Sequence, residues 1–208
     1  MRYGLYVITD EGISHGLSHV EIARKVAEGG ADVIQLRDKA RTGKDMLSIA
    51  LQIGEIARSS GVTFIVNDRL DLAMASNADG VHLGQEDLPV PFARKVSPKG
   101  FIIGTSVRTV QEALIAETEG ADYIALSPIF DTPTKSDAGP GKGLERLKEI
   151  KSAVSIPVIA IGGIGKSNVC QVLDAGADGV AVISAVVGQK DIAKATAEMR
   201  YLVYHTKK

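Results

Sequence analysis

One short pattern, a Gly or Asn followed by Ala-Asp and an apolar run, occurs four times in this chain of 208 residues. The four copies are Gly30-Ala31-Asp32, Asn77-Ala78-Asp79, Gly120-Ala121-Asp122 and Gly176-Ala177-Asp178. They recur roughly every 50 residues, an interval that suits two strand-helix units. Four double units make eight strands and eight helices, so the pattern predicts an α/β fold, a single (βα)8 TIM barrel over residues 1–208.

Eight strand-like runs can be identified on this basis. Those that follow the copies are residues 33–36, 80–83, 123–126 and 179–183, and those between them are residues 5–9, 63–66, 101–104 and 157–161. Continuous apolar runs are typical of parallel strands that are buried on both faces. An open, doubly wound sheet is the alternative, but it does not favour eight regularly alternating strands, and no G-x-G-x-x-G motif follows the first run.

Helix boundaries are predicted from capping residues. Ser18 and Glu21, like Thr109 and Glu112, have the spacing of a capping box at the start of an amphipathic segment. Further helices are predicted over residues 144–154, 167–175 and 191–204. The four repeated aspartates, Asp32, Asp79, Asp122 and Asp178, precede their strands and are therefore expected to be structural.

Charge and composition narrow the class of function. Lys plus Arg is 24 and Asp plus Glu is 25, so no overall field attracts nucleic acid or a membrane surface, and any anion site is local. The chain begins in strand-like sequence without the pattern of a signal peptide, and no apolar run approaches the ~20 residues of a membrane span. The only cysteine, Cys170, is expected to be a small core residue. We expect a cytoplasmic protein with small-molecule partners, and a homo-oligomer is compatible with the sequence.

Polar residues after the second, third and fourth strands are the first candidate site, because chemistry in such barrels gathers at the carboxyl ends of the strands. The segment Gln35-Leu36-Arg37-Asp38-Lys39 carries two cations two residues apart, so Arg37 and Lys39 point the same way if the strand continues. Two cations on one face favour a bound anion there over the alternative, a salt bridge to Asp38 or to a nearby loop. Asp68 and Asp87 follow adjacent strands and together suit Mg²⁺, with Glu86 a weaker candidate. The alternative for Asp68 is capping of the helix near Leu70.

The remaining strand ends predict a second anion site. Two glycine-rich or short turns, Ile161-Gly162-Gly163-Ile164-Gly165 and Ile183-Ser184-Ala185, occur where barrels commonly bind phosphate. The long segment from Ser127 to Gly143 carries Thr132, Thr134 and Lys135 and is interpreted as either a phosphate-binding lid or a solvated loop. Ser106 is a possible hydrogen-bond donor to a substrate, and His82 is expected to be a structural histidine.

Together these motifs resemble the thiamine-phosphate synthase family. The resemblance runs from Tyr6 to about Val187 and is carried by the following segments: residues 35–39, 66–68, 82–87, 128–130, 132–135, 161–164 and 182–184. Each motif is short, but their order and spacing make the set specific.

The resemblance implies a transferase that couples 4-amino-2-methyl-5-hydroxymethylpyrimidine diphosphate to 4-methyl-5-(2-phosphooxyethyl)thiazole, with thiamine phosphate and pyrophosphate as products. It implies that the pyrimidine diphosphate is bound by Gln35, Arg37, Lys39, Asn67, Ser106 and Lys135. It implies Mg²⁺ ligation by Asp68 and Asp87, and a thiazole-phosphate site made of Thr132, Thr134, Gly163, Ile183 and Ser184. The expected catalytic cations are Arg37, Lys39 and Lys135, and the other expected substrate contacts are Leu36, Asp38 and Pro133.

Three alternatives are weighed against this interpretation. A thiazole tautomerase of the same superfamily typically lacks the Arg-x-Lys and Asn-Asp pairs, which are present here at Arg37, Lys39, Asn67 and Asp68. A non-catalytic phosphate-ligand sensor would not need a metal site. Another barrel isomerase or lyase would need an acid/base pair in the mouth of the barrel, whereas the carboxylates here suit a metal better.

Overall fold

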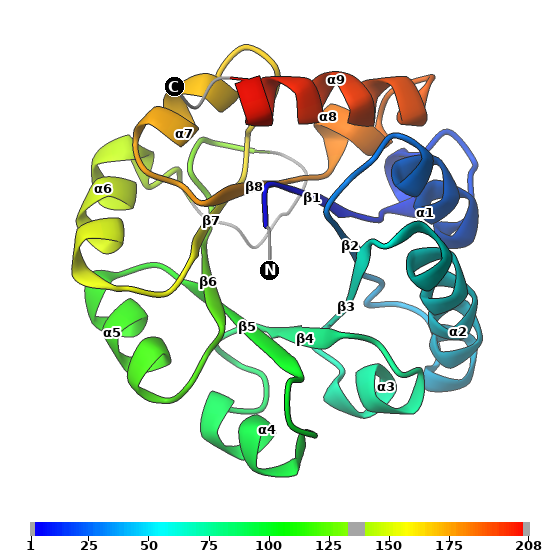
Figure 1. Cartoon of the computed structure of the whole chain (residues 1–208), viewed down its shortest axis with the longest axis horizontal. Coiled ribbons are helices and arrows are strands. Elements are labelled where there is room, and N and C mark those ends of the chain that lie inside the picture. The colour runs from blue at the N-terminus through cyan, green and yellow to red at the C-terminus, as the bar shows by residue number, and fades with distance from the viewer. Residues whose placement is uncertain (1–2, 133–139, 206–208) are drawn as a thin grey trace.

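Eight parallel strands form a closed barrel in chain order in the computed structural model, which describes residues 3–132 and 140–205 (Figure 1). The strands are β1 Leu5–Ile8, β2 Val33–Leu36, β3 Thr63–Asn67, β4 Gly80–Leu83, β5 Ile102–Val107, β6 Tyr123–Leu126, β7 Val158–Ile161 and β8 Gly179–Val182. The barrel closes where β1 pairs with β8, with Tyr6 opposite Ala181. The predicted (βα)8 barrel is confirmed, and the open-sheet alternative is wrong.

Helices surround the barrel and cover its outer face (Figure 1). They are α1 His19–Glu28, α2 Gly43–Ser60, α3 Leu70–Ala75, α4 Val90–Val96, α5 Val110–Thr118, α6 Gly143–Ala153, α7 Val169–Asp174, α8 Ser184–Val187 and α9 Ile192–His205, with a short 3₁₀ helix η1 at Glu11–Ile13. The sequence does not predict η1 and α8, because three or four residues are too few to show a helical period. Cys170 on α7 packs against the core, as expected.

The two predicted capping boxes differ in the structure. Ser18 caps α1, and its box with Glu21 is complete in both directions. Thr109 caps α5 by accepting from the Glu112 N–H, but the Glu112 carboxylate accepts from Arg108 N–H instead of from the cap itself. The helix start is therefore confirmed at both places, whereas the reciprocal bond forms only at the first.

Each position of the repeated pattern has the same structural role in all four copies. The first residue has a positive φ, +53° at Asn77 and +83° to +103° at the three glycines, a conformation that Gly and Asn tolerate best. The alanine is buried in every copy. The aspartate carboxylate accepts a hydrogen bond of 2.7–2.8 Å from a backbone N–H at the start of the preceding strand, namely from Leu5, Phe64, Ile103 and Val158. The prediction that these aspartates are structural is confirmed.

Two separate apolar clusters form the core. The larger one lies between the strands and the helices, and the smaller one fills the barrel interior around Tyr6 and Tyr123. The Tyr123 ring lies so close to β5 that a Cβ at Gly104 would come within 2.0 Å of it. The interior is therefore packed with side chains, and the space available for ligands is at the carboxyl ends of the strands.

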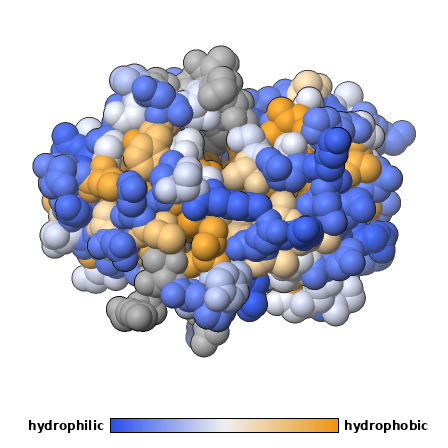
Figure 2. Space-filling view, turned by 90° about the horizontal axis from the view of Figure 1, so that it is seen from above, coloured by the Kyte–Doolittle hydropathy of each residue, from blue (hydrophilic) through white to orange (hydrophobic). Residues whose placement is uncertain are grey.

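The outer surface is mixed in character. Hydrophilic residues predominate on the side of the molecule seen in Figure 2, with hydrophobic residues scattered among them. Within residues 3–132 and 140–205, none of the helices combines the length and the apolar character that crossing a membrane requires.

Candidate active site

Two hollows open at the carboxyl ends of the strands. We call the first the polar cleft: it has a volume of about 1160 Å³ including its open mouth, and its lining includes Arg37, Lys39, Asn67, Asp68, Gln85, Glu86, Asp87 and Arg108. We call the second the glycine-turn hollow: it measures about 370 Å³, and it is lined by Ser127, Thr132, residues 161–164 and residues 181–184. A third space in the barrel interior lies next to both hollows, since its lining includes Ser127, which lines each of them as well.

Cations from one loop and carboxylates from two others meet in the polar cleft. Arg37 and Lys39 follow β2, Asp68 follows β3 and Asp87 follows β4, so three consecutive strand ends supply them. The capping alternative for Asp68 is wrong, because the N-cap of α3 is Arg69 and has no side-chain cap bond. Asp68 instead has a φ of +61°, and its backbone N–H donates to the carbonyl of His82 at 2.8 Å. The structure brings these four side chains to the lining of one cleft.

The two aspartates of the polar cleft lie close enough together for Asp87 to perturb Asp68. Burial and the neighbouring Asp87 raise the pKa of Asp68 to about 6, although Lys39 and Arg37 partly oppose this. The Asp87 carboxylate is held in place by its own loop, because its Oδ2 accepts a hydrogen bond from the Gly84 N–H at 2.6 Å. Two adjacent carboxylates on a rigid base are a donor set that suits a hard divalent cation. Asp68 and Asp87 are therefore the residues of the cleft that could hold such an ion.

A chain of hydrogen bonds crosses the floor between the hollows. The Gln35 amide donates to the Tyr6 hydroxyl at 2.9 Å, and the Tyr6 and Tyr123 hydroxyls are 3.0 Å apart. His82 contacts the Tyr123 hydroxyl through Nδ1 and the Ser106 hydroxyl through Nε2, both at 3.0 Å. Burial raises the pKa of both tyrosines far above the usual value, so their hydroxyls stay neutral. His82 is thus a buried structural histidine, as predicted, but its partners include a candidate substrate contact.

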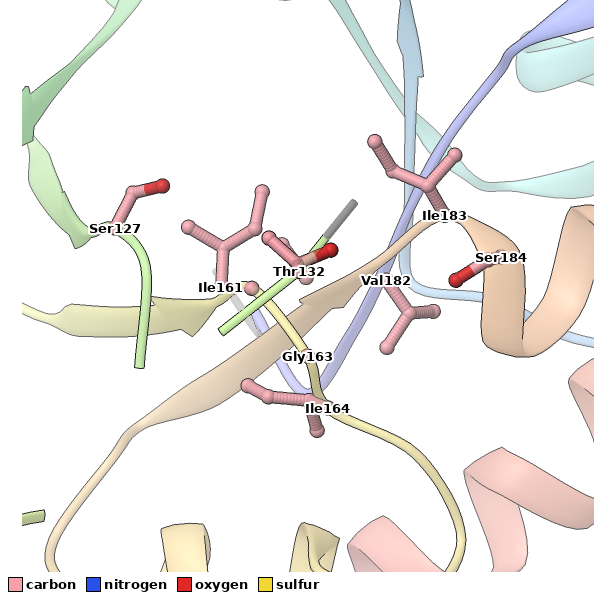
Figure 3. Close-up of a pocket in the computed structure, with 10 residues that line it drawn as sticks. Ser127, Thr132, Ile161, Gly163, Ile164, Val182, Ile183 and Ser184 are labelled. Carbon is pink, nitrogen blue, oxygen red and sulfur yellow. The ribbon is translucent and has the colours of Figure 1, made fainter. Parts of the chain in front are cut away.

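The glycine-turn hollow is built from backbone and hydroxyl groups. Gly162 and Gly163, which follow β7, have φ values of +102° and +64°. Ser184 begins α8 directly after β8, and Thr132 comes from the loop after β6. Figure 3 shows Thr132 in the space between Ile161 and Ser184. The predicted residues Thr132, Gly163, Ile183 and Ser184 therefore line one hollow, and the described residues of its lining include no ionisable side chain.

The loop after β6 is attached to the glycine turn. Ile129 N–H donates to the Ile161 carbonyl at 2.8 Å, and Phe130 N–H donates to the Gly162 carbonyl at 3.1 Å. A Cβ at Gly163 would lie 2.8 Å from the Cβ of Phe130. This attachment sets the position of Thr132. Three predicted site residues, Pro133, Thr134 and Lys135, lie outside the described residues.

Three predicted substrate contacts line neither hollow, and one of them, Gln35, lines only the third space. Leu36 is fully buried between the barrel and the helices. The Asp38 carboxylate turns away from the polar cleft and contacts His19 and Arg41. Leu36 and Asp38 point to the opposite side from Arg37 and Lys39.

Glu11, His19 and Asp38 form a second group that could hold a metal, with one ligand atom of each lying within 4.8 Å of the others. The Arg41 guanidinium, however, bridges the two carboxylates of this group, at 2.5 Å from Glu11 and 3.1 Å from Asp38. A cation, the Arg41 guanidinium, is thus already present between these carboxylates.

Sequence reasoning missed several residues that line the hollows. Ser127 lines all three spaces, Gln85 and Arg108 line the polar cleft, and Tyr6 and Tyr123 form the floor. The tyrosines could have been noticed, because a polar tip inside a continuous apolar strand needs a partner. No comparable pattern distinguishes Ser127 or Arg108 from an ordinary loop residue.

The matches to known proteins cover nearly the whole chain, and they name the same family. The model of a family described as thiamine monophosphate synthase matches residues 5–186. The thiamine-phosphate synthase of Methanoculleus marisnigri is 60% identical over 200 residues, which cover 96% of this chain and 95% of that protein. The thiamine-phosphate synthase of Methanocella arvoryzae is 57% identical over 203 residues, which cover 98% of this chain and 96% of that protein. The solved structure of thiamine phosphate pyrophosphorylase from Pyrococcus furiosus superposes with a TM-score of 0.92 at 44% identity, covering 99% of this chain and 98% of that one.

Proposed function

Because this chain belongs to the thiamine monophosphate synthase family and is a transferase that forms thiamine phosphate, we propose that its two hollows bind the two phosphorylated substrates. The observation that carries this proposal is the difference in charge between the hollows. The polar cleft contains cations and a carboxylate pair, whereas the lining of the glycine-turn hollow, as far as residues 3–132 and 140–205 form it, has no ionisable side chain. A diphosphate with a divalent ion suits the first, and a phosphate monoester held by N–H and hydroxyl groups suits the second.

The pyrimidine diphosphate occupies the polar cleft in this proposal. Arg37 and Lys39 bind the diphosphate oxygens, and Asn67 contributes a neutral hydrogen bond. Gln35 and Ser106 stand at the two ends of the hydrogen-bond chain below the cleft and contact the pyrimidine ring. Lys135 is assigned to the diphosphate by the family resemblance alone, because it lies outside the described residues.

Asp68 and Asp87 would hold Mg²⁺ in this proposal. The raised pKa of Asp68 means that the second negative charge is costly in this cleft without a cation close by. Mg²⁺ typically uses one or two protein carboxylates and fills its remaining positions with water and substrate phosphate. Bound there, Mg²⁺ would supply Lewis-acid stabilisation of the departing diphosphate.

The thiazole phosphate occupies the glycine-turn hollow. Thr132 and Ser184 offer hydroxyl donors, and the backbone at Gly163 and Ile183 borders the same space. The left-handed turn at Gly162 and Gly163 allows the backbone to approach a phosphate closely. Thr134 and Pro133 are added to this site by the family resemblance only.

The proposed reaction is dissociative. The C–O bond to the diphosphate breaks first, and its electron pair leaves with pyrophosphate. The 4-amino group of the pyrimidine donates electron density into the resulting methylene cation, and the thiazole nitrogen then attacks that carbon to form the C–N bond. The protein needs no nucleophile for this sequence. Arg37 and Lys39 stabilise the departing charge, and the two hollows, which share Ser127 in their linings, hold the two reacting atoms close together.

The alternatives leave part of the site without a role. A thiazole tautomerase or a phosphate sensor would use the glycine-turn hollow but not the cation and carboxylate groups of the polar cleft. The cytoplasmic location and the possible homo-oligomer stay predictions from the sequence.

The test is pyrophosphate release by the purified protein with both substrates. We expect release that requires the thiazole phosphate and stops when a chelator removes Mg²⁺. Lys135→Ala should lose most of this activity and remain folded. Release that proceeds without the thiazole phosphate, or that does not depend on a divalent ion, would contradict the two-substrate assignment.

A further inference from the structure

A compact polar network lies behind the loop that joins β2 to α2. Its centre is His19, which is only 1% exposed and contacts the Thr9 hydroxyl through Nδ1 at 2.7 Å. The other ring nitrogen, Nε2, contacts Asp38 Oδ2 at 3.2 Å. Arg41 joins Asp38 to Glu11, and Glu11 accepts from the His19 backbone N–H at 2.8 Å. The network thus ties the loops after β1 and β2 to the start of α1.

The network holds the chain on both sides of the proposed diphosphate-binding cations. The backbone N–H of Arg37 donates to the Thr9 hydroxyl at 3.5 Å, a long bond that fixes the exit from β2. Asp38 Oδ1 accepts from the backbone N–H groups of Ala40 and Arg41 at 2.8 and 3.2 Å, which closes a turn around Lys39. These bonds lower the pKa of Asp38 even though burial raises it, so the carboxylate is ionised at neutral pH.

The side chains alternate across this loop. Arg37 and Lys39 line the polar cleft, whereas Asp38 between them faces the network and lines none of the hollows. Asp38 therefore has no route to a substrate in the cleft. The contacts of the Asp38 side chain with His19, Ala40 and Arg41 restrain the segment that carries the two cations.

We propose that Asp38 is a positioning residue, which acts through His19, Thr9 and Arg41 to aim Arg37 and Lys39 at the diphosphate. The inference rests on the proposed assignment of the polar cleft to the pyrimidine diphosphate. Long cationic side chains and their backbone lose conformational entropy when they bind a ligand. A loop that is already fixed in the free protein loses less, so binding of the diphosphate is more favourable. The benefit should appear in binding of the diphosphate and not in binding of the thiazole phosphate.

The experiment compares Asp38→Ala and Arg41→Ala with the unaltered chain. Arg41 is partly exposed, so its loss leaves the core intact and provides a variant that folds if Asp38→Ala does not. The readouts are the dissociation constant of pyrophosphate with Mg²⁺ by calorimetry, and the KM of each substrate in the coupled reaction. We expect pyrophosphate affinity to fall about 10-fold and the KM of the pyrimidine diphosphate to rise by a similar factor, with the thiazole phosphate KM within about twofold.

Arg146→Ala is the matched control, because Arg146 is another partly exposed arginine that pairs with a carboxylate, Glu149, but it lies on α6 away from this loop. It should leave both KM values unchanged. Equal effects of Asp38→Ala on both substrates, or unchanged pyrophosphate affinity in both network variants, would overturn the proposal.

A double-mutant cycle separates positioning from direct contact. If Asp38 acts through the two cations, Asp38→Ala should cost at most about threefold in kcat/KM for the pyrimidine diphosphate once Arg37 and Lys39 are already alanine. A full 10-fold loss in that background would mean that Asp38 contributes independently, which overturns the proposal. If Arg37→Ala and Lys39→Ala themselves leave pyrophosphate affinity unchanged, the assignment of the cleft fails instead, and the two failures are distinguishable.

Discussion

The polar cleft and the glycine-turn hollow lie side by side at the same end of one barrel, yet they are built in opposite ways. The cleft depends on ionisable side chains, which project from the loops after β2, β3 and β4. The hollow depends on backbone conformation, with two left-handed glycines after β7 and hydroxyls at its edge. An anion can thus be bound either by charges on side chains or by the shape of the main chain. The two sites should therefore fail under different substitutions.

Asp68→Ala is expected to have the largest effect and to act on the polar cleft alone. Removing one of two carboxylates weakens Mg²⁺ binding and so removes stabilisation of the leaving group, a loss on the order of 10²–10³ in rate. The measurement is Mg²⁺-dependent pyrophosphate release, with titration of Mg²⁺ to show a weaker apparent affinity.

Asp71→Ala is the control for this substitution. Asp71 is an exposed aspartate three residues further along, on α3, where it pairs with Arg69 and does not line the cleft. It should retain full activity. If Asp68→Ala turned over at the normal rate, the metal assignment would be lost.

Gly163→Ala is expected to damage the glycine-turn hollow by about 10-fold or more in the KM of the thiazole phosphate. An alanine there would require φ of +64° and would place its Cβ 2.8 Å from the Cβ of Phe130 and 2.9 Å from the Asp131 carbonyl oxygen. The turn or the attached loop must therefore move. Pyrophosphate affinity at the polar cleft should stay unchanged.

Gly165→Ala is the matched control, because a Cβ at Gly165 would meet nothing within 4 Å. We expect its kinetic constants to remain within about twofold of the unaltered chain. Loss of affinity for both substrates in Gly163→Ala would show that the two hollows are less independent than their construction indicates.

Asp68→Asn should give the smallest effect, a change in stability that depends on pH. The pKa of Asp68 is about 6 in the folded protein, against 3.8 as the ordinary value, so the folded state holds this proton more tightly. The carboxylate therefore lowers stability increasingly as the pH rises from about 4 through 6. Without metal, Asp68→Asn should be more stable above pH 6, by about 1 kcal/mol at most once solvent screening of the half-exposed pair is considered.

Thermal unfolding at several pH values measures this difference. A gain of ~2–4 °C in Tm is expected at pH 7.5, and it should disappear near pH 4. Saturating Mg²⁺ should reverse the order, because only the unaltered chain gains from metal binding. A difference in Tm that is the same at pH 4 and pH 7.5 would exclude repulsion between Asp68 and Asp87 as its cause.

Local patterns were sufficient to predict much of the site. Arg37, Lys39, Asp68 and Asp87 each follow a recognisable strand, and parallel strands deliver their carboxyl ends to one rim. Local patterns do not predict the direction in which a loop side chain points. Asp38 lies between the two cations in the sequence, but only its contact with His19, the first residue of α1, shows that it faces away from the cleft.

The sequence by itself determined the barrel and the structural role of the repeated aspartates, because each of these depends on bonds between neighbouring units of the chain. A left-handed residue, a buried alanine and an aspartate that binds the adjacent strand specify one double unit, and four copies specify the closed sheet. Only the tertiary structure decided the hydrogen-bond chain of Tyr6, Tyr123, His82 and Ser106 in the barrel interior. These contacts form only when the barrel closes, since their partners lie on four different strands and closure alone brings them within hydrogen-bonding distance.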